Sequence, residues 1–223
     1  VDFRIPHVIR GKDPLDNRAL HASIARALGA KPPEYVHHGL LVGADGRKLS
    51  KRHGAASLAD LRRRGIPGEA VRAYLDELGL PRGDVRFDDR RLRRLATDAI
   101  AGLSDDELAA RVGVEPRLAP ALRGARDLGE AGEIADSLLD ASPPDASASP
   151  ETLDRFAELL QGASAELDPD GAKAILRELK AVGGDLRALR LALTGSERGP
   201  ELWTVLLALS RDEALRRASA ARG

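Results

Sequence analysis

Residues 7–11 read His-Val-Ile-Arg-Gly, and residues 35–42 read Tyr-Val-His-His-Gly-Leu-Leu-Val. Both are short runs with β-branched residues, and such runs predict buried strands. Between them, Asp13-Pro14 predicts a helix start, because proline suits the first helical turn and aspartate can cap it. The apolar face that follows has helical spacing and consists of Leu20, Ile24, Ala27 and Leu28. Strand, helix and strand in this order predict half of an α/β unit, too small to form a sheet of its own.

From Ser57 onward the pattern is helical almost to the end of the chain. Ser57-Leu-Ala-Asp60 resembles a capping sequence, and Ser104-Asp-Asp-Glu107 matches the capping box. Residues 141–150, rich in Ala, Ser and Pro, form the one low-complexity linker, and we expect a mobile loop there. Helices are predicted between Ser57 and Gly65 and over 68–78, 89–101, 104–112, 116–124, 128–140, 150–163, 169–182, 185–193 and 198–208.

Composition narrows the class of protein. Hydrophobic residues make up 43% of the chain and charged residues 31%, which is typical of a soluble globular protein. Cysteine is absent, which excludes disulfides, Fe–S clusters, thiolate zinc and cysteine nucleophiles. No apolar run approaches the roughly 20 residues that cross a bilayer, and no signal peptide opens the chain. We therefore expect a cytoplasmic protein. Because the chain lacks methionine and begins at Val1 within strand-like sequence, we also expect it to be a piece of a longer protein.

Charge is unevenly placed, although 35 basic residues balance 35 acidic ones. Residues 1–65 hold 13 Lys and Arg against 6 Asp and Glu, whereas residues 127–170 hold 12 acids and one base. A basic N-terminal part of the chain is suited to binding a ligand that carries phosphate. The alternative is a set of ordinary solvated helix faces.

The segment from Gly46 to Gly54 reads Gly-Arg-Lys-Leu-Ser-Lys-Arg-His-Gly and holds four cations within six residues. A cation-dense loop bordered by glycines can wrap a polyphosphate, with lysine charges and with hydrogen bonds from serine and backbone N–H groups. Such charges stabilise the transition state of nucleotidyl transfer. On composition alone, the loop could equally be a solvated basic hairpin tip.

Lys48-Leu-Ser-Lys51-Arg52 resembles the KMSKS loop of class I aminoacyl-tRNA synthetases, in the form found in glutamyl-tRNA synthetases. Further stretches resemble the same family in the same order: 7–13, 40–54, 67–79, and 189–195 with 199–202. The family's HIGH-like motif is absent from this chain, so we expect the chain alone to be inactive. Lys12 and Pro14 stand where the family usually has Glu and His, and the family's acidic insertion between Leu80 and Phe87 is reduced here.

The resemblance implies a mainly α fold with three parts. Residues 1–54 would be the end of a class I (Rossmann-type) catalytic domain, a small α/β remnant carrying the KLSKR loop. Residues 55–95 would be a helical connector that contacts the tRNA stem. Residues 96–223 would form an all-helical anticodon-binding domain containing the linker.

The resemblance also implies a reaction and a set of site residues. The family activates glutamate with ATP to glutamyl-adenylate and transfers glutamate to tRNA(Glu). Lys51 and Lys48 match the catalytic lysines, and the ATP-binding loop consists of Lys48, Leu49, Ser50, Lys51 and Arg52. Arg10 matches an arginine of the amino-acid pocket, with a structural salt bridge as the alternative, and Asp13 borders that pocket or caps a helix. ATP with Mg²⁺ is expected as substrate, with no protein-bound metal, and His7 and His53 are expected to be structural.

Contact with tRNA is implied for the helical remainder. The candidate residues are Arg62, Arg63, Arg64, Arg90 and Arg94, grouped with Arg91 and Arg93, and the alternative is solvated helix ends. Trp203 is expected in the core rather than stacked on a base.

Three functions stay open. The first is part of a glutamate–tRNA ligase, expected to be a monomer with no membrane partner. The second is a non-catalytic tRNA-binding module derived from one. The third is a helical scaffold with a basic loop.

Overall fold

The structure is a computed structural model of the 223-residue chain, and it describes residues 5–49, 57–140, 150–164 and 166–222. By internal packing the chain divides into two compact units. The first unit comprises Val1–Arg63 and Gly68–Leu95, and the second comprises Arg64–Pro67 and Ala96–Gly223. This is a division by packing, so the three functional domains expected from the sequence remain a prediction.

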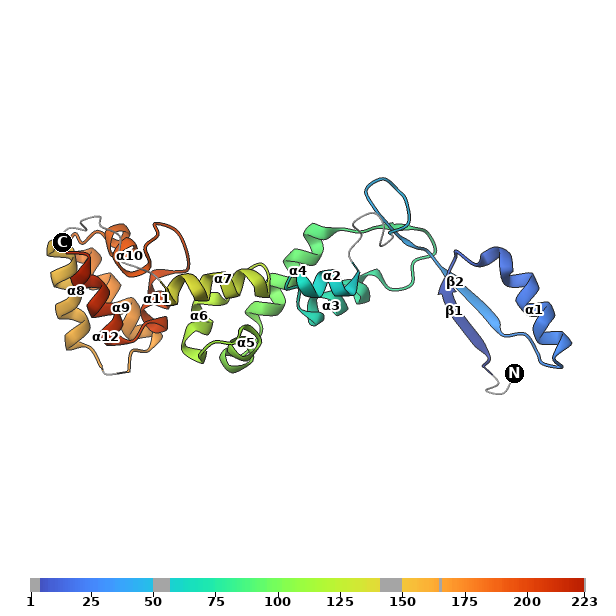
Figure 1. Cartoon of the computed structure of the whole chain (residues 1–223), viewed down its shortest axis with the longest axis horizontal. Coiled ribbons are helices and arrows are strands. Elements are labelled where there is room, and N and C mark those ends of the chain that lie inside the picture. Colours follow the sequence, from blue (N-terminus) through green and yellow to red (C-terminus); the bar gives the residue numbers. More distant parts are fainter. Residues whose placement is uncertain (1–4, 50–56, 141–149, 165, 223) are drawn as a thin grey trace. The chain divides into compact units, whose positions relative to one another are not determined.

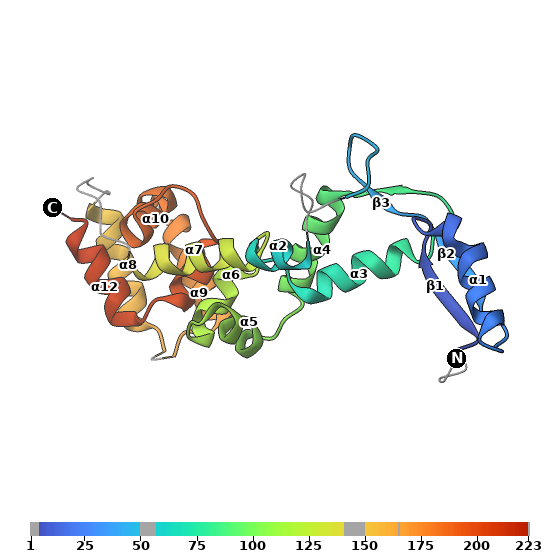
Figure 2. The ribbon, with the colours of Figure 1, turned by 45° about the vertical axis from the view of Figure 1, so that its right-hand side comes forward.

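A parallel strand pair opens the first unit. Strand β1 (His7–Gly11) pairs with β2 (Glu34–His38), and Arg10 lies directly opposite His37 in the register. The crossover between the strands contains a 3-10 turn η1 (Leu15–Asn17) and helix α1 (Arg18–Ala27), which lies beside the pair in Figures 1 and 2. The predicted order of strand, helix and strand is confirmed. The strand predicted over 35–42 is instead divided at residues 39–40 into two short strands that belong to different sheets. The expected burial of the strands is wrong, because Ile9 and Val36 remain exposed. The helix begins at Arg18, later than predicted, because a 3-10 turn takes up the residues after Pro14.

A second parallel pair and three helices complete the first unit. Strand β3 (Leu41–Val42) pairs with β4 (Val85–Arg86), a strand that the sequence analysis did not predict. The helices are α2 (Leu58–Arg63), α3 (Gly68–Leu78) and the start of α4 (Asp89–Ala101). Ser57 and Asp60 exchange hydrogen bonds at the start of α2, which confirms the capping sequence. Tyr74, 4% exposed, packs edge-on against Phe87, and its hydroxyl accepts from the Asp88 backbone N–H at 2.8 Å.

In the part of the second unit that the structure describes, every regular element is a helix or a 3-10 turn. Its elements are α5 (Asp105–Val112), the 3-10 turn η3 (Pro116–Leu118), α6 (Ala119–Leu122), α7 (Leu128–Leu139), α8 (Pro150–Gly162), α9 (Pro169–Ala181), α10 (Leu186–Thr194), α11 (Leu202–Ala208) and α12 (Arg211–Ala220). Helix α11 packs against α6 and α9, and α12 packs against α8 and α10. The capping box at Ser104 is confirmed. The helix predicted over 116–124 is instead a 3-10 turn followed by one short helix, and α12 was not predicted.

Small and branched aliphatic side chains build the core of the second unit, as the scarcity of aromatics predicts. Phe156 is fully buried there among leucines and alanines. Trp203 is partly buried and packs against this core, with the Lys173 ammonium 4.4 Å from its ring centroid. The tryptophan therefore lies at the edge of this core rather than inside it, and its expected core position is confirmed only in part. The linker predicted at 141–150 lies outside the described residues except for Pro150, which begins α8.

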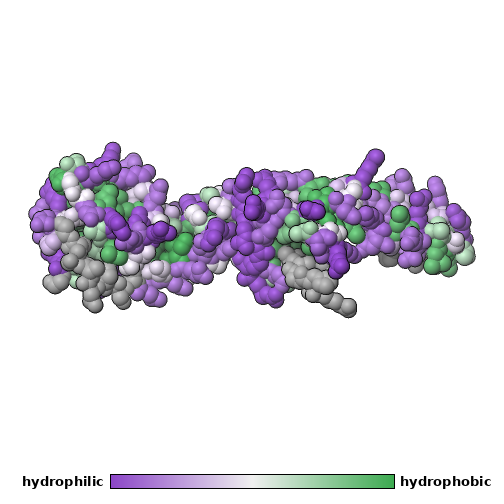
Figure 3. All heavy atoms as spheres, turned by 90° about the horizontal axis from the view of Figure 1, so that it is seen from above, coloured by the Kyte–Doolittle hydropathy of each residue, from purple (hydrophilic) through white to green (hydrophobic). Residues whose placement is uncertain are grey.

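Apolar side chains remain exposed on the first unit. On α1 they recur at every fourth residue, at Leu20, Ile24 and Leu28, and on the strands they include Ile9 at 59% and Val36 at 40% exposure. In Figure 3, hydrophobic green patches lie among purple ones at the right-hand end, where α1 and the β1–β2 pair lie. Parallel sheets are normally covered on both faces. The β1–β2 pair therefore exposes apolar side chains of the kind that a larger parallel sheet would cover.

Candidate functional site

Arg10 is the first predicted site residue that the fold places. It lies on β1, and its half-buried guanidinium is held by groups from β2 and the crossover. Nε donates to Nε2 of His37 at 3.1 Å, and Nη2 donates to the Pro14 carbonyl oxygen at 3.3 Å. Nη1 lies 3.2 Å from Nδ1 of His21, and the guanidinium lies 4.7 Å from the Tyr35 ring centroid. Among the residues that the structure describes, Arg10 makes no salt bridge, the structural alternative, because its partners there are imidazoles, a carbonyl and an aromatic ring.

Residues 43–49 form a hairpin that carries Lys48. The Gly43 N–H donates to the Arg47 carbonyl at 2.8 Å, Asp45 accepts from the Arg47 N–H at 3.0 Å, and Gly46 has a positive φ of 74°. The chain then returns beside β3, where the Leu49 N–H donates to the Leu41 carbonyl at 3.1 Å. This hairpin presents the Lys48 side chain in an exposed position.

Asp13 and Lys48 are brought together although 35 residues separate them. The Lys48 ammonium forms an ion pair with the Asp13 carboxylate, and both side chains remain partly exposed. Asp13 makes no N-cap hydrogen bond, since the 3-10 turn after Pro14 has no side-chain cap. The helix-cap alternative for Asp13 is therefore wrong. The ion pair places the basic hairpin at the end of the strand that carries Arg10.

Lys12, which replaces a glutamate usual in the resembling family, has its own partner. Its ammonium lies 2.7 Å from Asp84, whose other carboxylate oxygen accepts from the Leu40 N–H at 2.8 Å. The Lys12 hydrogen bond, followed by the Leu40 N–H, lowers the pKa of Asp84 below its ordinary value. This contact ties the end of β1 to the segment before β4.

The remaining loop residues expected to bind ATP, Ser50, Lys51 and Arg52, lie outside the described residues, as does His53. His7 lies 3.3 Å from Glu34, its register partner on β2. Among the described residues, no group of three His, Asp or Glu side chains is arranged to hold a metal ion. In the same part of the chain, no helix combines the length and apolarity that crossing a bilayer requires.

The arginines expected to contact tRNA differ in their surroundings. Arg62, Arg90 and Arg94 are exposed, and within the described residues they have no ion-pair partner, whereas Arg63 pairs with Asp60. Arg64 is half-buried. Arg91 and Arg93, which complete the predicted group, bind Glu77 and Asp89. Since Arg90 and Arg94 are four residues apart on α4, they lie on one helical face.

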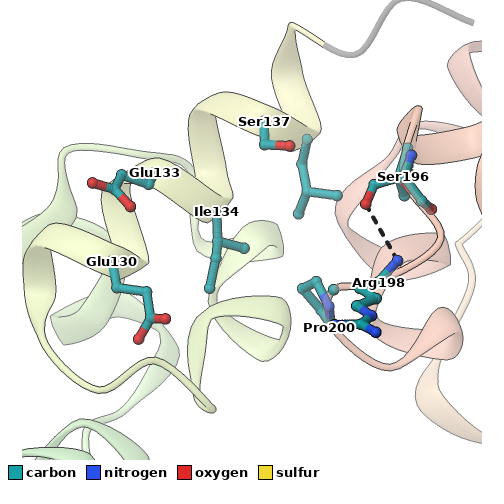
Figure 4. A pocket seen from close by; sticks show the side chains of 10 residues that line it. Glu130, Glu133, Ile134, Ser137, Ser196, Arg198 and Pro200 are labelled. Atoms are coloured by element: carbon teal, nitrogen blue, oxygen red, sulfur yellow. Dashed lines mark hydrogen bonds between the residues drawn. The ribbon is translucent and has the colours of Figure 1, made fainter.

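The second unit contains a groove of about 240 Å³ that sequence analysis did not predict. Figure 4 shows Glu130, Glu133, Ile134 and Ser137 of α7 along one side and Ser196, Arg198 and Pro200 along the other. The Arg198 N–H donates to Ser196 Oγ at 3.2 Å, which folds the segment between α10 and α11.

Comparison with known proteins finds similarity first to a class of enzymes and then to one kind of enzyme within that class. Residues 1–91 match the family model of the catalytic domain of class I tRNA synthetases (E and Q). A glutamate–tRNA ligase of Rubrobacter xylanophilus is 34% identical and is matched by 100% of this chain, over 63% of its own length. A glutamate–tRNA ligase of Rhodospirillum rubrum is 35% identical and is matched by 97% of this chain, over 55% of its length.

A solved structure shares the fold. The glutamate–tRNA ligase of Elizabethkingia meningosepticum, crystallised with its amino acid, aligns with a TM-score of 0.72 at 18% identity, over 99% of this chain and 57% of that one. The predicted fold class, mainly helical with a small α/β part, is therefore confirmed. The family model matches less than half of the 223-residue chain, and the chain spans 55% to 63% of the length of these relatives.

Proposed function

We propose that this chain is part of a glutamate–tRNA ligase that forms glutamyl-adenylate from glutamate and ATP and transfers glutamate to tRNA(Glu). The observation that carries the proposal is the ion pair between Lys48 and Asp13. It joins the basic hairpin, expected to bind ATP phosphates, to the strand end that carries Arg10, expected to bind glutamate. The similarity to glutamate–tRNA ligases along the chain supports the same assignment.

In this proposal each group has a chemical task. A glutamate carboxylate oxygen attacks the α-phosphorus of ATP, and pyrophosphate leaves with the electron pair of the broken bond. Lys51 and Lys48, with Ser50, Arg52 and the backbone at Leu49, would hold the phosphates and stabilise the charge that develops on them. ATP is the substrate, and Mg²⁺ is expected to accompany it. In the free chain, the Asp13 carboxylate is paired with the Lys48 ammonium. The ATP phosphates would therefore have to displace this carboxylate in order to bind Lys48.

The decisive assay is ATP–pyrophosphate exchange that depends on glutamate and tRNA. It is run on the longest open reading frame that contains this chain. Lys51→Ala and Lys48→Ala should each reduce exchange by about a hundredfold, the scale of losing one preorganised charge at a reacting phosphate. The matched control is Lys31→Ala, an exposed lysine of the same unit outside the hairpin. Exchange that survives in Lys51→Ala would contradict the catalytic role of the loop.

A second function, a non-catalytic tRNA-binding module, stays open. In the described part of the first unit, each of the two sheets has two strands, and Ile9 and Val36 on the β1–β2 pair remain exposed. Catalysis would need further strands and the missing HIGH-like motif from elsewhere in the protein. A protein that binds tRNA but gives no exchange would support this second function.

Binding to tRNA is proposed for the exposed face of α4. The affinity for tRNA is measured at several salt concentrations, and the logarithm of the affinity is plotted against the logarithm of the salt concentration. In the double variant Arg90→Ala/Arg94→Ala, the magnitude of the slope should fall by about 0.7–0.9 for each phosphate that is no longer neutralised. Arg72→Ala is the control, because Arg72 is exposed but already pairs with Asp76 at 3.0 Å. Equal slopes in both variants would remove α4 from the interface. A cytoplasmic location and a monomeric state stay predictions.

A further inference from the structure

The Arg10 guanidinium is held in place without being neutralised. Within the described residues it contacts no carboxylate; its partners are two imidazoles, one backbone carbonyl and one aromatic ring. A partly buried arginine is usually paired with an acidic side chain. Here the positive charge is fixed in position but has no anionic partner among the described residues.

The contacts with Arg10 require a lone pair on one nitrogen of each imidazole. A guanidinium has N–H donors and no acceptor, so each ring nitrogen that faces it must offer a lone pair. His37 therefore accepts at Nε2 and carries its proton on Nδ1, whereas His21 accepts at Nδ1 and carries its proton on Nε2. Either ring would lose its acceptor and repel Arg10 on gaining a second proton.

We propose that His37 and His21 are positioning residues, which aim the Arg10 guanidinium at a substrate carboxylate and leave its full charge available to that carboxylate. The inference rests on the proposed role of Arg10 in the amino-acid pocket and adds to it a reason for selecting an acidic amino acid. A carboxylate partner from the chain would cancel the charge, whereas two neutral acceptors orient the guanidinium and leave it uncancelled.

The surroundings of His37 disfavour the protonated form of its ring. Loss of hydration lowers the pKa of His37 below its ordinary value, and the charges of Arg10 and Arg18 lower it further. The groups that face this assembly come from each packed element: Arg10 on β1, Tyr35 on β2, and Arg18 and His21 on α1. Since no acid is among them, acidification should release Arg10 rather than strengthen its attachment.

The first test needs no catalytic activity. The histidine rings of the full 223-residue chain, labelled with ¹⁵N, are titrated by NMR. In the wild type, His37 should be the Nδ1–H tautomer and should protonate below the ordinary histidine range. Arg10→Met should raise its pKa toward that range and remove the tautomer preference. His38, whose Nδ1 lies 2.8 Å from the Gly39 carbonyl, is the internal control. An unchanged His37 titration in Arg10→Met would overturn the positioning inference.

The second test measures exchange kinetics on the longest open reading frame. His37→Leu removes the acceptor and should raise the glutamate KM about tenfold, the usual loss for a hydrogen bond to a charged group, with the ATP KM unchanged. His37→Gln keeps an acceptor oxygen and should restore most of the glutamate affinity. In the wild type, the glutamate KM should rise as the pH falls through the pKa of His37. In His37→Gln, this rise should be absent, because glutamine does not titrate.

The outcomes separate the two proposals. A wild-type protein with no exchange refutes the proposed function, while the NMR titration still decides whether the histidines hold Arg10. Active protein in which the leucine and glutamine variants behave alike, or in which the ATP KM rises as much as the glutamate KM, refutes the positioning role.

Discussion

Replacing Arg217 with methionine should destabilise the second unit more than any surface substitution in it. The Arg217 side chain is 2% exposed although it carries a charge. Its Nε donates to Glu213 at 2.5 Å, and Nη1 donates to the carbonyl oxygens of Leu138 and Leu193 at 2.9 and 2.8 Å. Nη2 donates to the Leu139 carbonyl at 3.2 Å. One side chain of α12 therefore satisfies the C-terminal carbonyls of both α7 and α10.

The magnitude follows from these contacts. A hydrogen bond from a charged group contributes about 1.5–3 kcal/mol, and a buried carbonyl left without a donor costs about 1–3 kcal/mol. Methionine preserves much of the side-chain volume but none of the donors, so the buried carbonyls of Leu138 and Leu193 lose their guanidinium. Breaking a buried ion pair costs about 3–5 kcal/mol, and we expect about 4 kcal/mol here. That is a large part of the roughly 5–15 kcal/mol by which domains are stable.

The assay is urea unfolding followed by tryptophan fluorescence. Trp203 is the only tryptophan and packs against the core of the second unit, so its emission reports that unit. Arg216→Met is the matched control, because Arg216 binds the same Glu213 but its side chain is 60% exposed. The control should lose less than about 1 kcal/mol. If Arg217→Met does not fold, Arg217→Lys, which keeps the charge but not the fork of donors, replaces it. A loss no larger than that of the control would refute the reasoning.

Three further predictions concern stability. Hydrogen bonds from Arg216, and then from Arg217, lower the pKa of Glu213 to about 2 from its ordinary value of 4.5. The stability that the Glu213 carboxylate contributes is therefore complete above pH 4.5 and is lost as the pH falls toward 2. Over that pH range, the urea midpoint of Glu213→Gln should change less than the midpoint of the wild type. Gly39→Ala should cost the first unit about 3 kcal/mol or more in thermal melts, because its Cβ would lie 1.8 Å from the Gly83 carbonyl oxygen, whereas Gly83→Ala meets nothing within 4 Å. Ser104→Ala should cost about 1 kcal/mol by Trp203 fluorescence, because it removes a capping box.

Local sequence patterns were sufficient to predict most helices and strands, because helix caps and hydrophobic periodicity depend on residues that are close in the sequence. Two elements were missed. The sequence of α12 did contain a signal, since Ser210 precedes Glu213 by three residues and its hydroxyl accepts from the Glu213 N–H at 3.2 Å. Strand β4 contained none, because two residues are too few to show an alternating pattern.

The residues of the candidate site could be predicted from the sequence, but the residues that they contact could not. Arg10, Asp13 and Lys48 could be selected because an arginine near a strand end and lysines in a glycine-bordered loop suit carboxylates and phosphates. Their contacts could not be predicted, since Asp13 meets Lys48 across 35 residues and Arg10 meets His37 across 27. Spacing in the sequence contains no information on such pairs until the strand register is known.

The sequence by itself determined the helices, their caps, the basic hairpin and the resemblance to a tRNA synthetase, all of which depend on residue type and short spacing. Only the tertiary structure decided that Arg10 contacts the imidazoles of His37 and His21 and that Arg217 is buried. The physical reason is the same for both residues. Imidazole lone pairs and backbone carbonyls become partners of a guanidinium only after folding excludes water and brings together elements from distant parts of the chain.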